Sequence, residues 1–90
     1  MSERRTILVV DDEPGMRAGL AAVLGRGGFT VDVATTGEDG LARLLQGGID
    51  LLVTDLRLPV MDGVELLKRA KALGLGRELP TEWFLENVSP

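Results

Sequence analysis

Two apolar runs that end near carboxylates restrict what this chain can fold into more than any other feature. The first run, residues 6–10, is Thr-Ile-Leu-Val-Val and is followed by Asp11 and Asp12. The second, Leu-Leu-Val at residues 51–53, is followed one residue later by Asp55. Neither run alternates between apolar and polar residues, which is typical of strands that are buried on both faces of a sheet. A carboxylate at the end of such a strand needs a partner, because burying an unpaired charge is costly.

The remaining elements follow in a regular order. Apolar residues at helical spacing predict helices over residues 14–24, 37–46 and 63–73, and glycines follow each of them. Residues 29–34 alternate like a strand at the edge of a sheet. Strands joined by helices predict a parallel sheet with right-handed crossovers. The fold class is therefore α/β, with three layers and with helices on both faces of the sheet.

Each predicted helix has an apolar side that should face the sheet. The residues expected there are Met16, Leu20, Val23 and Leu24, then Leu41, Leu44 and Leu45, then Leu66, Leu67, Ala70 and Leu73. Lys68, Arg69 and Lys71 fall on the outer side of the last helix, where solvated cations are expected.

Three carboxylates should meet at one edge of this sheet. Strand order 2-1-3 makes the first and third strands neighbours, about 4.8 Å apart, so that Asp11, Asp12 and Asp55 share the carboxyl edge. Carboxylates about 5 Å apart repel each other by roughly 3 kcal/mol at an effective dielectric near 20. An all-oxygen cluster of this kind favours Mg²⁺, Mn²⁺ or Ca²⁺. The alternative is that Asp12 and Glu13 only cap the first helix.

Composition excludes several classes of function. The chain has no histidine and no cysteine, which excludes imidazole catalysis, disulfides and thiolate metal sites. Its net charge is −4 and it has no basic block, so a nucleic-acid partner is not expected. No apolar run approaches the roughly 18 residues of a membrane span, and no signal peptide is evident. We therefore expect a cytoplasmic protein without a membrane partner, and an independent enzyme is disfavoured.

Two segments together resemble a known family. Residues 9–13, Val-Val-Asp-Asp-Glu, and residues 55–63, Asp-Leu-Arg-Leu-Pro-Val-Met-Asp-Gly, are similar to the response-regulator receiver domain of two-component phosphorelay signalling. The resemblance covers residues 5 to about 80 and implies a flavodoxin-like sheet. It also implies a signalling module rather than an enzyme.

The resemblance implies a role for each site residue. Asp55 would accept a phosphoryl group from a histidine kinase or a phosphotransfer protein, with Mg²⁺ or Mn²⁺ as cofactor. Asp12 would bind the metal directly, Asp11 mainly through water, and Asp55 and the backbone carbonyl of Arg57 would complete the ligand set.

The chain also departs from the family. A receiver has five strand–helix units, and only three are expected here, so we interpret residues 1–78 as a truncated receiver and residues 79–90 as a divergent C-terminal tail. The family's hydroxyl residue after its fourth strand and lysine after its fifth have no counterpart. The phosphoacceptor would then be impaired as a switch. The alternative is a receiver remnant that is not phosphorylated and acts by dimerising or by titrating a partner.

The expected third strand lacks the neighbour that a complete receiver gives it. Exposed strand edges recruit other strands, so we expect a homodimer formed through this strand and the tail. Residues 81–88, Thr-Glu-Trp-Phe-Leu-Glu-Asn-Val, could form a short helix or a strand. The alternative to a dimer is a monomer in which the tail folds back over its own sheet.

Overall fold

The computed structural model describes residues 4–55 and 57–73. Its elements are β1 (Thr6–Val10), α1 (Pro14–Arg26), β2 (Thr30–Ala34), α2 (Gly37–Leu45), β3 (Leu51–Thr54) and α3 (Gly63–Ala72). The predicted alternation of strands and helices is confirmed, with ends that shift by one or two residues. The predicted tail, residues 79–90, lies outside the described residues. No helix within the described ranges is long and apolar enough to cross a bilayer.

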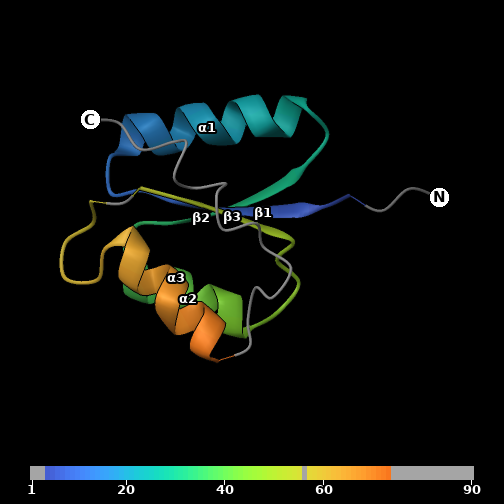
Figure 1. Ribbon diagram of the computed structural model, residues 1–90. Coiled ribbons are helices and arrows are strands. Elements are labelled where there is room, and N and C mark those ends of the chain that lie inside the picture. The colour runs from blue at the N-terminus through green and yellow to red at the C-terminus, as the bar shows by residue number, and fades with distance from the viewer. Residues whose placement is uncertain (1–3, 56, 74–90) are drawn as a thin grey trace.

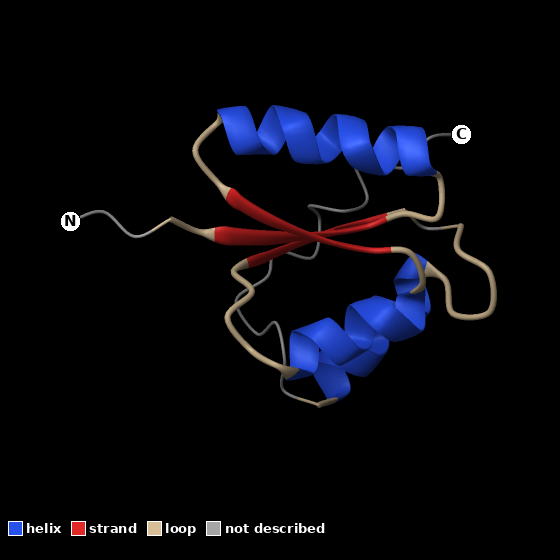
Figure 2. Cartoon of the chain, turned by 180° about the vertical axis from the view of Figure 1, so that it is seen from behind, coloured by secondary structure: helices blue, strands red, loops and turns tan. Residues whose placement is uncertain are grey.

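The three strands form a parallel sheet in the order β2-β1-β3. Ile7 of β1 lies between Val31 of β2 and Leu51 of β3, so the first strand of the chain is the central strand. Figure 1 shows α1 on one face of the sheet and α2 with α3 on the other, and the reverse view in Figure 2 agrees. The α/β fold class and the order 2-1-3 are therefore confirmed.

The core is divided by the sheet into two unequal parts, because successive side chains of a strand point to opposite faces. Leu8 and Val10 belong to the larger cluster, together with residues of α2 and α3 such as Leu44 and Leu66. Ile7 and Val9 belong to the smaller cluster on the other face. Fewer side chains are buried on the α1 face, and none of the residues of α1 is buried.

The residue before each helix is an N-cap: its side chain accepts a hydrogen bond from the backbone N–H three residues further along. Glu13, Thr36 and Asp62 are these N-cap residues for α1, α2 and α3. Such caps satisfy one of the N–H groups left without a partner in the first turn.

Four apolar residues that were expected to face inward are instead half or more exposed. Met16 and Val23 of α1 are exposed because no other described helix packs on that face of the sheet. Leu45 is the last residue of α2 and Leu73 is the C-cap residue after α3, and both are exposed. These four residues lie on the apolar sides expected from the sequence, but their side chains are not buried.

Two glycines allow α2 to approach its neighbours closely. A Cβ on Gly37 would lie 2.4 Å from the carbonyl oxygen of Met61, and a Cβ on Gly40 would lie 2.9 Å from Cγ2 of Val10. Both glycines are buried. The start of α2 therefore rests directly against the loop that follows β3, which fixes the position of that loop beside the carboxyl edge of the sheet.

Candidate functional site

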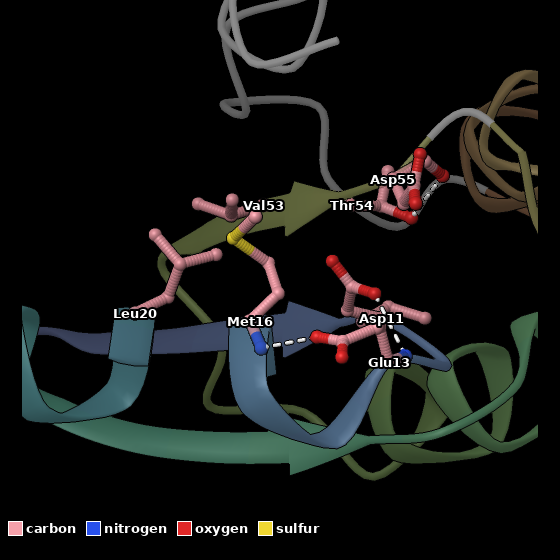
Figure 3. A pocket seen from close by; sticks show the side chains of 8 residues that line it. Asp11, Glu13, Met16, Leu20, Val53, Thr54 and Asp55 are labelled. Carbon is pink, nitrogen blue, oxygen red and sulfur yellow. Dashed lines mark hydrogen bonds between the residues drawn. The ribbon is translucent and has the colours of Figure 1, made fainter. Parts of the chain in front are cut away.

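The carboxylates of Asp11, Asp12 and Asp55 gather at the carboxyl edge of β1 and β3. Each offers an oxygen, and these oxygens all lie within 4.8 Å of one another. Figure 3 shows Asp11 and Asp55 at the ends of the two neighbouring strands. The parallel pairing of β1 with β3 causes this, because it brings both strands to an end at the same edge.

Asp11 is the buried member of the cluster. Its Oδ1 accepts a hydrogen bond of 2.9 Å from the backbone N–H of Glu13, and its own N–H donates to the carbonyl of Ala34. Burial raises the pKa of Asp11 above its ordinary value of 3.8, and the nearby carboxylates of Asp55 and Asp12 raise it further, against the lowering effect of the Glu13 N–H. A cation bound at the cluster would oppose this rise, since an opposite charge favours the ionised form.

Asp55 is held by its own loop. Its N–H donates to the carbonyl of Val10, and the Thr54 hydroxyl donates to its carbonyl oxygen. The backbone N–H of Arg57 donates to Oδ1 of Asp55 at 3.1 Å. This last bond draws the chain around the carboxylate, which places the backbone of Arg57 next to the cluster.

The alternative that Asp12 and Glu13 only cap α1 holds for Glu13 but not for Asp12. The Glu13 side chain caps α1 by accepting from the N–H of Met16. Asp12 is exposed, and its carboxylate oxygen belongs to the cluster. Capping therefore accounts for Glu13, but it does not account for Asp12 or Asp55.

An open groove runs from the acidic cluster along α1 and β3. Its volume is about 280 Å³. The lining residues are Val10, Asp11, Glu13, Met16, Leu20, Val53, Thr54 and Asp55. In Figure 3 the side chains of Met16, Leu20 and Val53 form its apolar end, and Asp11, Glu13 and Asp55 lie at the other. Sequence reasoning missed this groove, because helical spacing gives α1 an apolar face but does not show how much of that face is covered.

A second feature that sequence reasoning missed is the position of Arg17. Its Nη1 donates to the backbone carbonyl of Asp11 at 2.8 Å. The signal available in the sequence was the spacing. Arg17 follows Asp11 by six residues, so a long side chain near the start of the helix can reach back to the end of the strand. The guanidinium thus tethers α1 to the end of β1 through the backbone.

The donor set fits a hard divalent cation. All three side chains offer carboxylate oxygens, which Mg²⁺ and Mn²⁺ prefer. Octahedral Mg²⁺ binds oxygen at about 2.0–2.1 Å, so ligands on opposite sides of the ion are roughly 4.2 Å apart. The three carboxylate oxygens lie at most 4.8 Å from one another. A small side-chain rotation, or a water molecule as one ligand, would bring them to the spacing that Mg²⁺ needs. The acidic triad is typical of the Mg²⁺ site of receiver domains.

Comparison with known proteins now decides the family. The chain matches the response regulator receiver domain family over residues 7–80. It belongs to that family. The chain is therefore a receiver domain of a two-component system. Receiver domains take phosphate from histidine kinases and are generally not catalytic enzymes.

Curated relatives of this receiver are longer proteins. The transcriptional regulatory protein DltR of Streptococcus agalactiae (strain NEM316) is 41% identical over 69 residues, which are 77% of this chain and 31% of DltR. The sensor histidine kinase RcsC of Escherichia coli (strain K12) is 44% identical over 69 residues, which are 77% of this chain and 7% of RcsC. The receiver thus spans about a third of the one relative and a small part of the other.

Solved structures share its fold. The response regulator protein TrrA from Thermotoga maritima, in complex with Mg²⁺-BeF, is 35% identical with a TM-score of 0.74; the match covers 77% of this chain and 60% of TrrA. FixJ-N is 39% identical with a TM-score of 0.75, covering 82% of this chain and 59% of FixJ-N. This receiver therefore corresponds to a little more than half of each of these structures.

Proposed function

We propose that this receiver accepts a phosphoryl group on Asp55 from a histidine kinase or a phosphotransfer protein, with Mg²⁺ or Mn²⁺ as cofactor. The observation that supports this most is the gathering of Asp11, Asp12 and Asp55 within 4.8 Å in a chain of this family. Receiver domains work in the cytoplasm, which remains the proposed compartment.

In the proposed reaction, a carboxylate oxygen of Asp55 attacks the phosphorus of a phosphohistidine. The new O–P bond forms an acyl phosphate as the N–P bond breaks, and the electron pair of that bond returns to the imidazole nitrogen of the partner. The Arg57 N–H bond to Oδ1 orients the nucleophile. When bound, the cation neutralises charge on the phosphoryl oxygens.

Four groups would hold that cation. Asp12 is proposed as a direct ligand, because its carboxylate is exposed and does not cap α1. Asp11 is proposed to bind mainly through water, and Asp55 with the backbone carbonyl of Arg57 to complete the set. This assignment follows the family resemblance at residues 11–12 and 55–57.

Acetyl phosphate with Mg²⁺ tests the proposal without needing the natural kinase. We expect the intact protein to gain the mass of one phosphoryl group, and Asp55→Asn to gain none. Asp39→Asn is the matched control, since it removes an exposed acid in the first turn of α2, outside the cluster. Labelling that persists in Asp55→Asn, or a wild type that stays unlabelled at every donor concentration, would contradict the proposal.

The second candidate is a receiver remnant that binds partners without being phosphorylated. It is favoured by β3, which pairs only with β1 among the described strands. It is also favoured because residues 4–55 and 57–73 hold no counterpart of the family's hydroxyl and lysine residues. A phosphorylated form without such residues would be impaired as a switch. A homodimer through β3 and the tail belongs to this proposal, as does the division into residues 1–78 and 79–90.

A further inference from the structure

The groove beside the acidic cluster has two chemically different ends. One end is apolar and is formed by Met16 and Leu20 of α1 with Val53 of β3. The other end carries the carboxylates of Asp11, Glu13 and Asp55, and none of the groove's eight lining residues is basic. The guanidinium of Arg17 donates to the backbone carbonyl of Asp11 and not, in any described contact, to a carboxylate of the groove.

These two ends set the chemistry of a ligand. A volume of about 280 Å³ lies near the lower limit of pockets that hold small molecules, roughly 300 Å³. An anion would be repelled by the acidic end, and a compact divalent ion would leave the apolar end wet. A short hydrocarbon chain with a positive head satisfies both ends, because its methylenes would cover Met16 and Leu20 while its head stays among the carboxylates.

We propose that this groove binds a small amphipathic cation, a primary alkylammonium ion of about four to six carbons, with its ammonium group at Asp11 and Asp55 and its chain along Met16, Leu20 and Val53. Charge complementarity fixes the orientation of the ligand, since only one end of the groove is acidic. The apolar contact makes the site selective for chain length, which a plain counter-ion site is not.

Binding there would regulate the receiver, a consequence that rests on the function proposed above. Asp11 and Asp55 belong both to the groove and to the acidic cluster. An ammonium group between them occupies the oxygens that a divalent cation needs, and it shields the Asp55 oxygen from a phosphodonor. The alkylammonium ion and Mg²⁺ should therefore exclude each other.

The test is a titration of the full chain with methyl- to hexylammonium chloride at constant ionic strength, followed by amide shifts in NMR. We expect Kd to fall by about two- to fourfold per methylene, the range for partly to fully buried methylenes. The shifts should centre on Met16, Leu20 and Val53. Added Mg²⁺ should raise the apparent Kd in proportion to its concentration.

Two pairs of probes separate the contributions of the groove's ends. Met16→Gln should weaken pentylammonium binding several-fold, whereas Val23→Gln, a similarly exposed α1 position outside the groove, should leave it unchanged. Asp55→Asn should weaken pentylammonium several-fold and leave the weak binding of n-pentanol as it was.

The possible failures are distinct. Equal affinity for methyl- and pentylammonium would show only counter-ions at the acids, and equal affinity for pentylammonium and n-pentanol would show only an apolar crevice; either overturns the inference. A chain that is labelled at Asp55 by acetyl phosphate but shows neither chain-length dependence nor Mg²⁺ competition loses the groove ligand and keeps the proposed function. A chain that binds pentylammonium but is never labelled loses the proposed function and keeps the groove ligand.

Discussion

Asp11 combines burial with close negative neighbours, and both make its negative charge costly to maintain. Its side chain is 6% exposed, and its pKa is raised by burial first and by Asp55 and Asp12 next. In the folded chain without metal, the ionised form of Asp11 is therefore less favourable than in the unfolded chain. A raised folded-state pKa lowers stability as the pH rises from 3.8 through the folded value.

Asp11→Asn should accordingly stabilise the metal-free protein at neutral pH. We expect a gain of about 1 kcal/mol in the free energy of unfolding near pH 7, the usual size of a single-residue effect, because the amide can still accept the Glu13 N–H without a charge. The gain should shrink toward low pH, where wild-type Asp11 is protonated in both states.

Urea unfolding at several pH values, with and without Mg²⁺, measures this difference. Mg²⁺ should stabilise the wild type and do so less for the variant, because the variant has lost one carboxylate of the cluster. A variant that is less stable than the wild type near neutral pH without metal would contradict the account of Asp11.

Val60 is a second residue whose folded conformation is unfavourable for its side chain. It has a φ of 68°, a left-handed conformation that branched side chains rarely adopt, and its side chain is 95% exposed. Val60→Gly removes the strain and loses almost no burial. We expect a gain of about 1 kcal/mol in the free energy of unfolding, measured by urea titration. A matched change at Val64, which is 39% exposed and lies in α3, should be destabilising, since glycine is a poor helix former.

At the scale of elements, the helices differ in how closely they approach the sheet. Gly40 in α2 leaves no room for a Cβ, which would meet Val10 at 2.9 Å and Leu66 at 3.4 Å. Gly19 in α1 has nothing within 4 Å of a Cβ. Glycine to alanine is therefore expected to lower the free energy of unfolding at Gly40 and to raise it at Gly19.

Gly19→Ala should raise the free energy of unfolding by about 0.5–1 kcal/mol, through helix propensity alone. Gly40→Ala should lower it by about 1–3 kcal/mol, because Val10 is buried in the central strand and cannot move aside cheaply. Thermal or urea unfolding of the two variants, compared with the wild type, measures both. A Gly40→Ala variant that is as stable as the wild type, or more stable, would show that α2 does not approach β1 as closely as described.

The order and type of these elements could be predicted from sequence, because they depend on local patterns: apolar runs at residues 6–10 and 51–53, and apolar residues at helical spacing in the segments that become helices. The meeting of Asp11, Asp12 and Asp55 could also be predicted, since it follows from strand order. Exposure could not be predicted where it depends on what covers a helix.

The helix patterns of Met16 and Leu44 look alike in sequence, yet Met16 is half exposed and Leu44 is 4% exposed. The difference arises because α2 shares its face of the sheet with α3, while α1 stands alone on its face among the described helices. The groove was missed for the same reason. The left-handed backbone of Val60 was missed because valine gives no signal for it.

At the scale of the whole molecule, the proposed homodimer depends on β3. Within the described chain it has a strand partner, β1, on one side only, and strand edges of this kind favour intermolecular pairing. We expect a homodimer through β3 and the tail, and sedimentation velocity over a range of concentrations measures it.

Leu52→Lys is a poor test of this interface, because Leu52 is in the core. Leu51 is no better a position, because it pairs with Ile7 of β1 inside the sheet and packs against both core clusters. The concentration dependence of the wild type's sedimentation is therefore the test. A compact monomer of the wild type at micromolar concentration and above would contradict the expected dimer.

The helix caps described above place the first turns of α1 and α3 on the same short loops that carry the site. The carboxylate of Glu13 accepts from the N–H of Met16, and that of Asp62 accepts from the N–H of Glu65. Ordering of the loop at residues 11–13 therefore also orders the start of α1. We expect occupation of the acidic cluster to slow the exchange of the Met16 amide proton with deuterated solvent, because Glu13, which holds that proton, directly follows Asp12.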